Sequence, residues 1–186
     1  MIKIFKTTDS GVLQISEFED NSWISMTNPT TEELFSVSST YKIAPDDLRA
    51  SLDEEERSRI EIEEYYSLIL VDIPTIEERN GKDWYGTIPL AIIICDKVIV
   101  TVCLEDSPVL TAFMDGRVRN FYTHMKTRFI FQILYRNATL YLNYLRIIDR
   151  RSDAIEQKLH EATKNRELIE LLELEKSLVF FTTSLK

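Results

Sequence analysis

Residues 66–73 read YSLILVDI and residues 88–104 read IPLAIIICDKVIVTVCL, and both stretches are almost continuously apolar. Short apolar runs of this kind are typical of β-strands that are covered on both faces. In the second stretch only Asp96 and Lys97 separate two β-branched runs. We therefore expect two antiparallel strands there, joined by a two-residue hairpin turn.

The segments that surround these strands predict further elements of an α/β domain. Residues 2–5 and 23–26 are short strand candidates. Thr30 is a favourable N-cap for a helix, and Glu32 and Glu33 fall in the first turn, where carboxylates suit the helix dipole. Short helices combined with strands covered on both faces predict a layered α/β domain.

The second half of the chain changes to a period of seven residues. Two successive stripes of mostly apolar positions recur at alternating steps of four and three, which predicts two long helices packed as an antiparallel pair or in a bundle. The first stripe stops at Lys164-Asn165, where Asn165 is expected to cap the second helix. The first stripe is Leu134, Ala138, Tyr141, Leu145, Ile148, Ser152, Ile155, Leu159 and Ala162, and the second is Leu171, Leu174, Leu178, Phe181 and Leu185.

These patterns divide the chain into three parts. Residues 1–107 are the expected α/β domain, residues 108–164 the long-helix region packed on it, and residues 165–186 the start of a further helix. That helix is still in phase at Leu185, and no Gly, Asn or Pro terminates it. We therefore expect the chain to be cut from a longer protein whose helix continues; the alternative is a complete protein with a frayed C-terminal helix.

The composition limits the classes of partner. The chain has 22 basic and 31 acidic residues, a net charge of −9 and a pI near 4.8. This surplus of carboxylates argues against binding nucleic acid and makes cations the natural partners. No run approaches the ~18 apolar residues of a membrane helix. Cys95 and Cys103 lie in apolar runs, so we expect them to be buried and reduced.

The highest density of charged residues lies between Asp46 and Glu64, a segment that contains nine carboxylates and three arginines. Carboxylate oxygens are the ligands of hard cations such as Mg²⁺ and Ca²⁺, and clustering them raises affinity. The run lacks the glycine of an EF-hand loop. The alternative is a solvated acidic surface with internal ion pairs, which is the usual role of such a run.

No arrangement of residues predicts catalysis. The four glycines, Gly11, Gly81, Gly86 and Gly116, are scattered and form no phosphate-binding loop. His124 lies 36 residues before the only other histidine, so the two cannot share a local site. We therefore expect neither an enzyme nor catalytic residues.

Four segments of the chain point to a known family when they are taken together and in order. They are Arg57-Ser-Arg-Ile-Glu61 leading into EEYYSLILVDIP, the strand Tyr85-Gly-Thr-Ile-Pro-Leu90, the long-helix sequence RFIFQILYRNATLYLNYLRIID, and the C-terminal LLELEKSLVFFTTSLK. This ordered series resembles the cytosolic part of the CorA family of magnesium and cobalt transporters. The resemblance extends from about Trp23 to Lys186.

This resemblance implies a fold, an assembly and an ion. The fold is an α/β/α sandwich with a mixed β-sheet, followed by long antiparallel helices that begin a stalk. The assembly is a homopentamer at the cytoplasmic face of the cell membrane, with divalent cations as partners. Mg²⁺ or Co²⁺ is both the transported ion and the regulatory ion. The two membrane helices would lie beyond Lys186, so membrane contact is expected only through segments outside this chain.

The resemblance also implies a regulatory metal site between subunits. Many members carry an adjacent acidic pair ahead of the Arg-x-x-Ile-Glu segment, and in an ungapped register that pair falls here on Arg49-Ala50. Asp46, Asp47 and Asp53 flank this position and are the candidate metal ligands. Metal bound between opposed acidic faces would stabilise one arrangement of subunits over another.

Two other functions remain open from the sequence. A soluble oligomeric helical scaffold with no transport role would form a stable multimer that ignores metal. A carboxylate-metal hydrolase that uses the run from Asp46 to Glu64 would hydrolyse a phosphoester, and EDTA would abolish that activity.

Overall fold

The computed structural model describes residues 1–79, 81–161 and 165–185. The chain divides into two compact units. Unit 1 consists of Met1–Ile73 and Ile88–Tyr135, and unit 2 of Pro74–Thr87 and Arg136–Lys186. The strands β5 and β6 and the helix α4 each contribute residues to both units.

A seven-stranded mixed sheet, in the order β2-β1-β3-β7-β6-β5-β4, forms the centre of the fold. The β3–β7 pair is parallel, whereas the β1–β2, β1–β3, β4–β5 and β6–β7 pairs are antiparallel. The strands are β1 (Ile2–Thr8), β2 (Gly11–Ile15), β3 (Trp23–Thr27), β4 (Arg59–Ile62), β5 (Tyr66–Arg79), β6 (Lys82–Cys95) and β7 (Ile99–Cys103).

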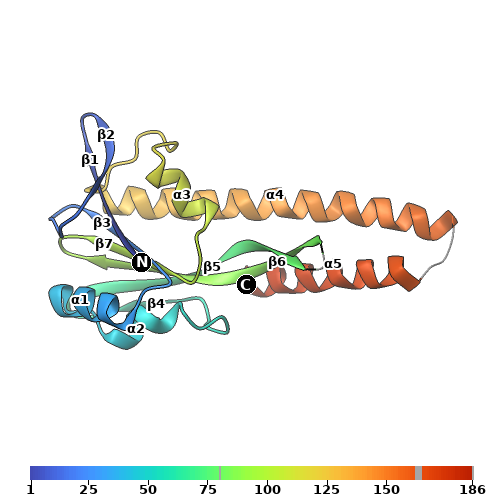
Figure 1. Cartoon of the computed structure of the whole chain (residues 1–186), viewed down its shortest axis with the longest axis horizontal. Helices are drawn as coiled ribbons and strands as arrows, with labels where there is room; N and C mark the ends of the chain where they lie inside the picture. Colours follow the sequence, from blue (N-terminus) through green and yellow to red (C-terminus); the bar gives the residue numbers. More distant parts are fainter. Residues whose placement is uncertain (80, 162–164, 186) are drawn as a thin grey trace. The chain divides into compact units, whose positions relative to one another are not determined.

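Helices cover both faces of the sheet in unit 1, which confirms the expected α/β/α sandwich. The helices α1 (Thr31–Tyr41) and α2 (Pro45–Ala50) lie on one face (Figure 1). The helix α3 (Pro108–Met114) and the first part of α4 (Lys126–Glu161) lie on the other (Figure 1). The sandwich is possible because both faces of β3 and β7 are apolar, so each face can bury a helix layer.

The alternation of side chains along β3 assigns residues to the two cores. Ile24 and Met26 point into the core beneath α1 and α2. Trp23 points to the other face, where its ring packs at 5.1–6.2 Å, centroid to centroid, from Phe113, Phe121 and Phe129. Its indole Nε1 donates a hydrogen bond of 2.9 Å to the buried Thr101 Oγ1.

Two predictions from the apolar strands are confirmed. The strands β6 and β7 form the expected hairpin, in which Cys95 N donates to Val98 O at 3.0 Å across Asp96 and Lys97. Cys95 and Cys103 are both buried free cysteines. Burial disfavours the thiolate and raises the pKa of each thiol to about 11.

The expected cap of the first helix is also confirmed. Thr30 forms a capping box: its Oγ1 accepts from Glu33 N at 3.3 Å, and its own N–H donates to Glu33 Oε2 at 2.8 Å. The same Glu33 carboxylate accepts from Ile2 N at 3.0 Å, so one side chain fixes the start of α1 to β1.

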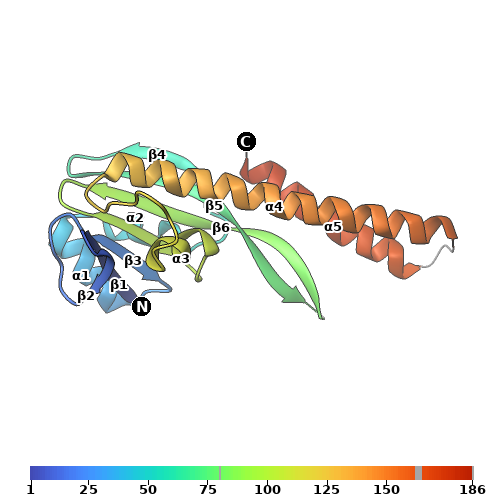
Figure 2. The same cartoon turned by 90° about the horizontal axis from the view of Figure 1, so that it is seen from above.

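Unit 2 contains the tip of the β5–β6 hairpin, the later part of α4 and α5 (Asn165–Ser184). The two helices run antiparallel to each other, as expected (Figure 2). Their shared core consists of Tyr85, Tyr141, Tyr144, Ile148, Ile155, Leu174 and Phe181.

The predicted heptad register is right in part of each helix. On α4, Tyr141, Ile148 and Ile155 are buried as expected, but Ala138 is exposed. The earlier buried positions on α4 are Phe129, Ile133 and Asn137. A straight helix of 3.6 residues per turn drifts relative to a seven-residue repeat, so no single heptad register follows one face along the whole helix.

On α5, Leu174 and Phe181 are buried as predicted. Leu178 on the helix and Leu185 just after it are exposed, so the prediction for them was wrong. The small Ser177 occupies a buried position instead, because it lies on the same face as Leu174 and Phe181 at helical spacing. Ala162 and Lys164, where the first stripe was expected to end, lie outside the described residues.

Candidate functional site

The three candidate aspartates lie on or just after the short helix α2 in unit 1. Asp46 and Asp47 occupy its first turn, where the helix dipole stabilises carboxylates. Asp53 follows in the turn after the helix and is exposed. Its Oδ1 accepts a hydrogen bond of 3.0 Å from Glu55 N, which fixes that turn.

Asp47 is held in place by a buried tyrosine. Tyr66 Oη donates to Asp47 Oδ2 at 2.5 Å and accepts from Ala44 N at 3.2 Å, so β5 is bonded to the start of α2. Burial and the hydrogen bond to the carboxylate both disfavour the phenolate and raise the pKa of Tyr66 to about 12. This carboxylate therefore has a fixed orientation, and one of its oxygens is already engaged.

Asp46 differs from Asp47 because its side chain is 99% exposed. Arg49, one turn later, places Nη1 3.9 Å from Asp46 Oδ1, a loose ion pair on the helix surface. The adjacent Ala50 is buried in the core beneath α1 and α2. Arg49 and Ala50 are thus one cationic residue and one core residue, and neither side chain can bind a metal ion.

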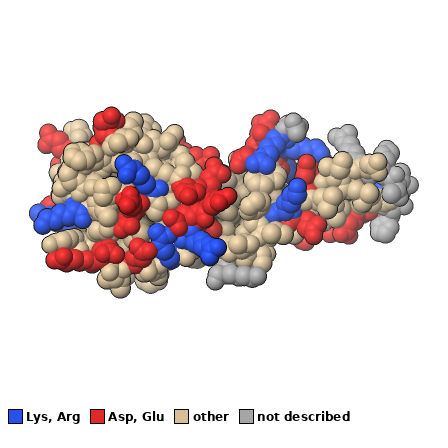
Figure 3. Space-filling model, turned by 90° about the horizontal axis from the view of Figure 1, so that it is seen from below, with Lys and Arg blue, Asp and Glu red and all other residues tan. Residues whose placement is uncertain are grey.

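The rest of the acidic run is partly neutralised. Arg59 is bonded to Glu56 and Glu61, the latter at 2.6 Å from Nε. Partial burial opposes the charge on this guanidinium, but the bonds to both carboxylates outweigh it and raise the pKa of Arg59. On the side of unit 1 that carries α1 and α2, acidic and basic side chains are interspersed (Figure 3). The ion-pair interpretation of the run therefore holds for Arg59, Glu56 and Glu61.

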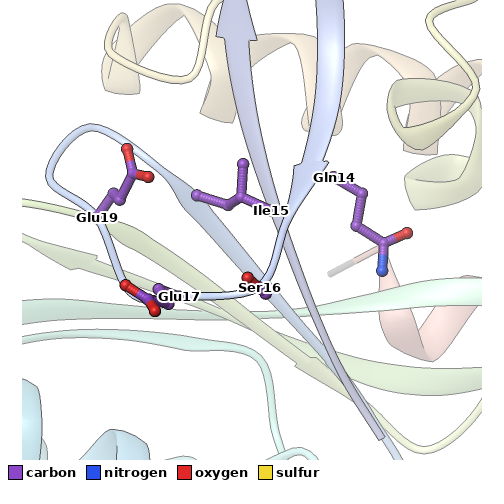
Figure 4. Close-up of a pocket in the computed structure, with 5 residues that line it drawn as sticks. All are labelled: Gln14, Ile15, Ser16, Glu17 and Glu19. Carbon is purple, nitrogen blue, oxygen red and sulfur yellow. The ribbon is translucent and has the colours of Figure 1, made fainter.

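A second acidic feature, which the sequence patterns did not predict, lies beside β2. An open depression of about 620 Å³ is lined by Gln14, Ile15, Ser16, Glu17 and Glu19. Gln14 points to the opposite side of the strand from Ile15, as alternation requires (Figure 4). Glu19 is paired with Lys6 at 2.6 Å, so its charge is balanced within unit 1.

Within residues 1–79, 81–161 and 165–185, no three His, Cys, Asp or Glu side chains are grouped closely enough to hold a metal ion. The structure therefore does not bring Asp46, Asp47 and Asp53 together as one ligand set. Over the same residues, no helix has the length and apolar character required to cross a lipid bilayer.

Comparison with known proteins identifies the family. Residues 18–186 match the family described as CorA-like Mg²⁺ transporter protein. The cobalt/magnesium transport protein CorA of Methanocaldococcus jannaschii is 30% identical over 172 residues. That alignment covers 88% of this chain and 51% of the relative, so the chain spans about half the length of the curated relative that it matches. The family description names transport rather than a chemical reaction.

Solved structures show the same fold. The soluble domain of CorA from M. jannaschii superposes with a TM-score of 0.84 at 24% identity, covering 100% of this chain and 74% of that domain. The complete structure of that magnesium transporter gives a TM-score of 0.85 at 23% identity, covering 100% of this chain and 59% of that protein. From the residues matched by the family model, the chain belongs to the CorA-like family of Mg²⁺ transporter proteins.

Proposed function

We propose that this chain is the cytosolic regulatory part of a channel-type transporter for divalent cations, Mg²⁺ or Co²⁺, and that it senses the ion and gates a pore formed by segments outside the chain. The observation that carries this proposal is the family match over residues 18–186. The proposed location is the cytoplasmic face of the cell membrane. The division into residues 1–107, 108–164 and 165–186 is the corresponding proposal for its domains.

We assign the regulatory contact to Asp46, Asp47 and Asp53. Asp46 and Asp53 are exposed, so their oxygens are accessible to a cation at a surface between subunits. Asp47 adds a carboxylate whose position is fixed by Tyr66. Three carboxylates on one subunit do not surround an ion, so ligands from a neighbouring subunit or water must complete the shell. Loss of the ion would leave like charges facing each other and favour separation.

The proposed homo-oligomer, a pentamer, is supported by the outer face of α5. A series of large apolar side chains on this helix and just after it is exposed, although the opposite face already packs within unit 2. A series of large exposed apolar side chains along one helix normally marks a surface that another protein surface covers. The natural cover is the same helix of neighbouring copies. The exposed residues are Leu168, Ile169, Leu172, Leu178, Val179, Phe180 and Leu185.

Limited proteolysis of the chain with and without Mg²⁺ tests the sensing proposal. We expect Mg²⁺ to slow cleavage of the wild type, and we expect a variant with Asp46, Asp47 and Asp53 all changed to alanine to lose that protection. A control variant, Glu17→Ala/Glu19→Ala, removes acidic side chains of unit 1 that lie outside α2 and should keep the protection.

Equal protection of the triple variant and the wild type would show that these residues are not the sensor. A stable multimer whose size and cleavage are unaffected by both Mg²⁺ and EDTA would favour the oligomeric scaffold instead. Light scattering after size-exclusion chromatography, run in both conditions, distinguishes the two.

A further inference from the structure

The tip of the β5–β6 hairpin contacts both helices of unit 2 through oppositely charged neighbours. Lys82 forms an ion pair with Glu170 on α5. Asp83 Oδ2 accepts from Arg151 Nη2 on α4 at 2.8 Å, and Asp83 O accepts from Arg151 Nη1 at 3.3 Å. Consecutive strand residues point to opposite faces, so this single dipeptide reaches two different helices.

The charges in this arrangement also fix which strand face meets which helix. A shift of the strand by one residue in one direction would place Lys82 beside Arg151, and a shift in the other direction would place Asp83 beside Glu170, in each case a pair of like charge. Each ion pair is half-exposed and contributes little by itself. Their joint effect is to favour one docked register of the hairpin over its neighbours.

Trp84 supplies the apolar part of the contact. Its ring meets Phe180 of α5 edge-on, with centroids 5.4 Å apart, and the Arg79 guanidinium lies 3.8 Å from the ring centroid. The ring also lies directly against the Gly86 Cα, because a Cβ on Gly86 would come within 2.6 Å of Trp84 Cζ3. Gly86 does not have a positive φ, so its backbone conformation does not require glycine. Glycine is required here because a side chain would block the close approach of the indole.

The direct contact between α5 and α4 involves three buried residues of α5. Among the α5 residues whose burial the structure describes, these are Leu174, Ser177 and Phe181. Phe181 packs edge-on against Tyr141, with centroids 5.1 Å apart. Leu174 and Phe181 also share a core with residues of α4 and with Tyr85 of the hairpin. Ser184 Oγ adds a further contact between α5 and the hairpin, a hydrogen bond of 3.1 Å to Thr87 Oγ1.

We propose that Lys82, Asp83, Trp84, Gly86 and Thr87 form a clasp that holds α5 against α4, and that the clasp and α5 open together as one cooperative unit. A helix with few buried contacts of its own has a low free energy of local opening. Contacts from the clasp raise that free energy, so releasing the hairpin tip releases α5. The clasp therefore controls the local opening of α5. This proposal does not depend on whether the chain regulates transport.

Hydrogen exchange measured by mass spectrometry on the 186-residue chain tests whether the clasp and α5 open together. Gly86→Ala inserts a methyl group against the indole and leaves the other clasp residues chemically unchanged. We expect exchange in residues 167–185 to become roughly tenfold faster, in parallel with residues 81–87, because both open in the same event. Exchange in β7 should be unchanged, which reports that unit 1 remains folded.

A second variant shows whether the effect passes through Trp84. Trp84→Ala should itself speed exchange in α5, and adding Gly86→Ala to it should cause no further change, because the ring that the methyl group displaces is gone. The proposal is overturned if the hairpin tip exchanges faster in Gly86→Ala while α5 does not. It is also overturned if Gly86→Ala has its full effect on α5 in the absence of the indole.

The charge pairs supply an independent test. Lys82→Glu should speed exchange in α5, and the swapped variant Lys82→Glu/Glu170→Lys should restore slow exchange. Lys158→Glu, which makes the same change of charge on exposed α4 surface, is the matched control. Failure of the swap to slow exchange below the level of Lys82→Glu alone would contradict the assigned contact.

Discussion

Tyr66→Phe removes the hydroxyl that joins β5 to the start of α2 and leaves the aromatic ring in its core position. The hydroxyl donates to Asp47 at 2.5 Å and accepts from Ala44 N at 3.2 Å. A hydrogen bond to a charged group contributes about 1.5–3 kcal/mol when it is shielded from water. Asp47 is only half-buried and water can replace the lost donor, so we expect a loss of about 1–2 kcal/mol in the free energy of unfolding.

Urea denaturation followed by tryptophan fluorescence measures this loss, with Tyr65→Phe as the matched control. Tyr65 is 50% exposed, and its substitution should change the free energy of unfolding by less than about 0.5 kcal/mol. The reasoning is refuted if Tyr66→Phe is as stable as the wild type, or if the two variants lose equal stability.

The same hydroxyl predicts a pH dependence. Because the pKa of Tyr66 rises from 10.0 to about 12 on folding, the folded state favours the neutral phenol. Its contribution is fully present below pH 10 and is lost as the pH rises through the interval up to about 12. The difference in stability between wild type and Tyr66→Phe should therefore shrink over that interval. A difference that stays constant would contradict the assignment.

Two further substitutions test the packing of unit 1. Thr30→Ala removes the acceptor for Glu33 N and should lower the free energy of unfolding by about 1 kcal/mol in a urea titration. The control Thr40→Ala, later in the same helix, should change the free energy of unfolding by less than about 0.5 kcal/mol. Thr101→Val leaves the buried Trp23 Nε1 without its acceptor and should lower the free energy of unfolding by about 1–3 kcal/mol in the same urea titration. An unchanged unfolding midpoint would mean that this hydrogen bond contributes nothing to stability.

The strands of the central sheet were predictable because apolar runs and turn residues act locally. The hairpin between β6 and β7 followed from a charged pair between two β-branched runs, and the start of α1 followed from Thr30 and Glu33. Both edge strands, β2 and β4, were missed. The residues of β2 lie near the surface and lack a strong alternation of apolar and polar side chains, and β4 is only four residues long. Edge strands bury little, so little of their sequence is constrained to be apolar.

The helix registers were only partly predictable. The heptad rule assumes one uniform helical partner, but the first turns of α4 pack against the aromatic cluster around Trp23, and the later turns pack with α5. The buried face of α4 therefore includes Phe129 and Ile133 rather than Ala138. Tertiary neighbours, which a local period does not encode, determine that choice.

The candidate site was predicted as a segment but not in its details. Acidic composition pointed to residues 46–64, yet only folding shows that Tyr66 holds Asp47, that Arg59 is paired with Glu56 and Glu61, and that Ala50 is a core residue. The first contact joins residues 19 positions apart and depends on the registry of β5 beside α2. The spacing of residues along the sequence alone does not predict which of them form such a pair.

Mg²⁺ flux through the protein encoded by the complete source gene, reconstituted in vesicles, tests the central claim most directly. We predict that flux falls as Mg²⁺ rises on the side that carries this chain, and that the variant with Asp46, Asp47 and Asp53 changed to alanine no longer responds. Flux that is independent of Mg²⁺ on that side in the wild type, or no flux at all, would contradict the proposal.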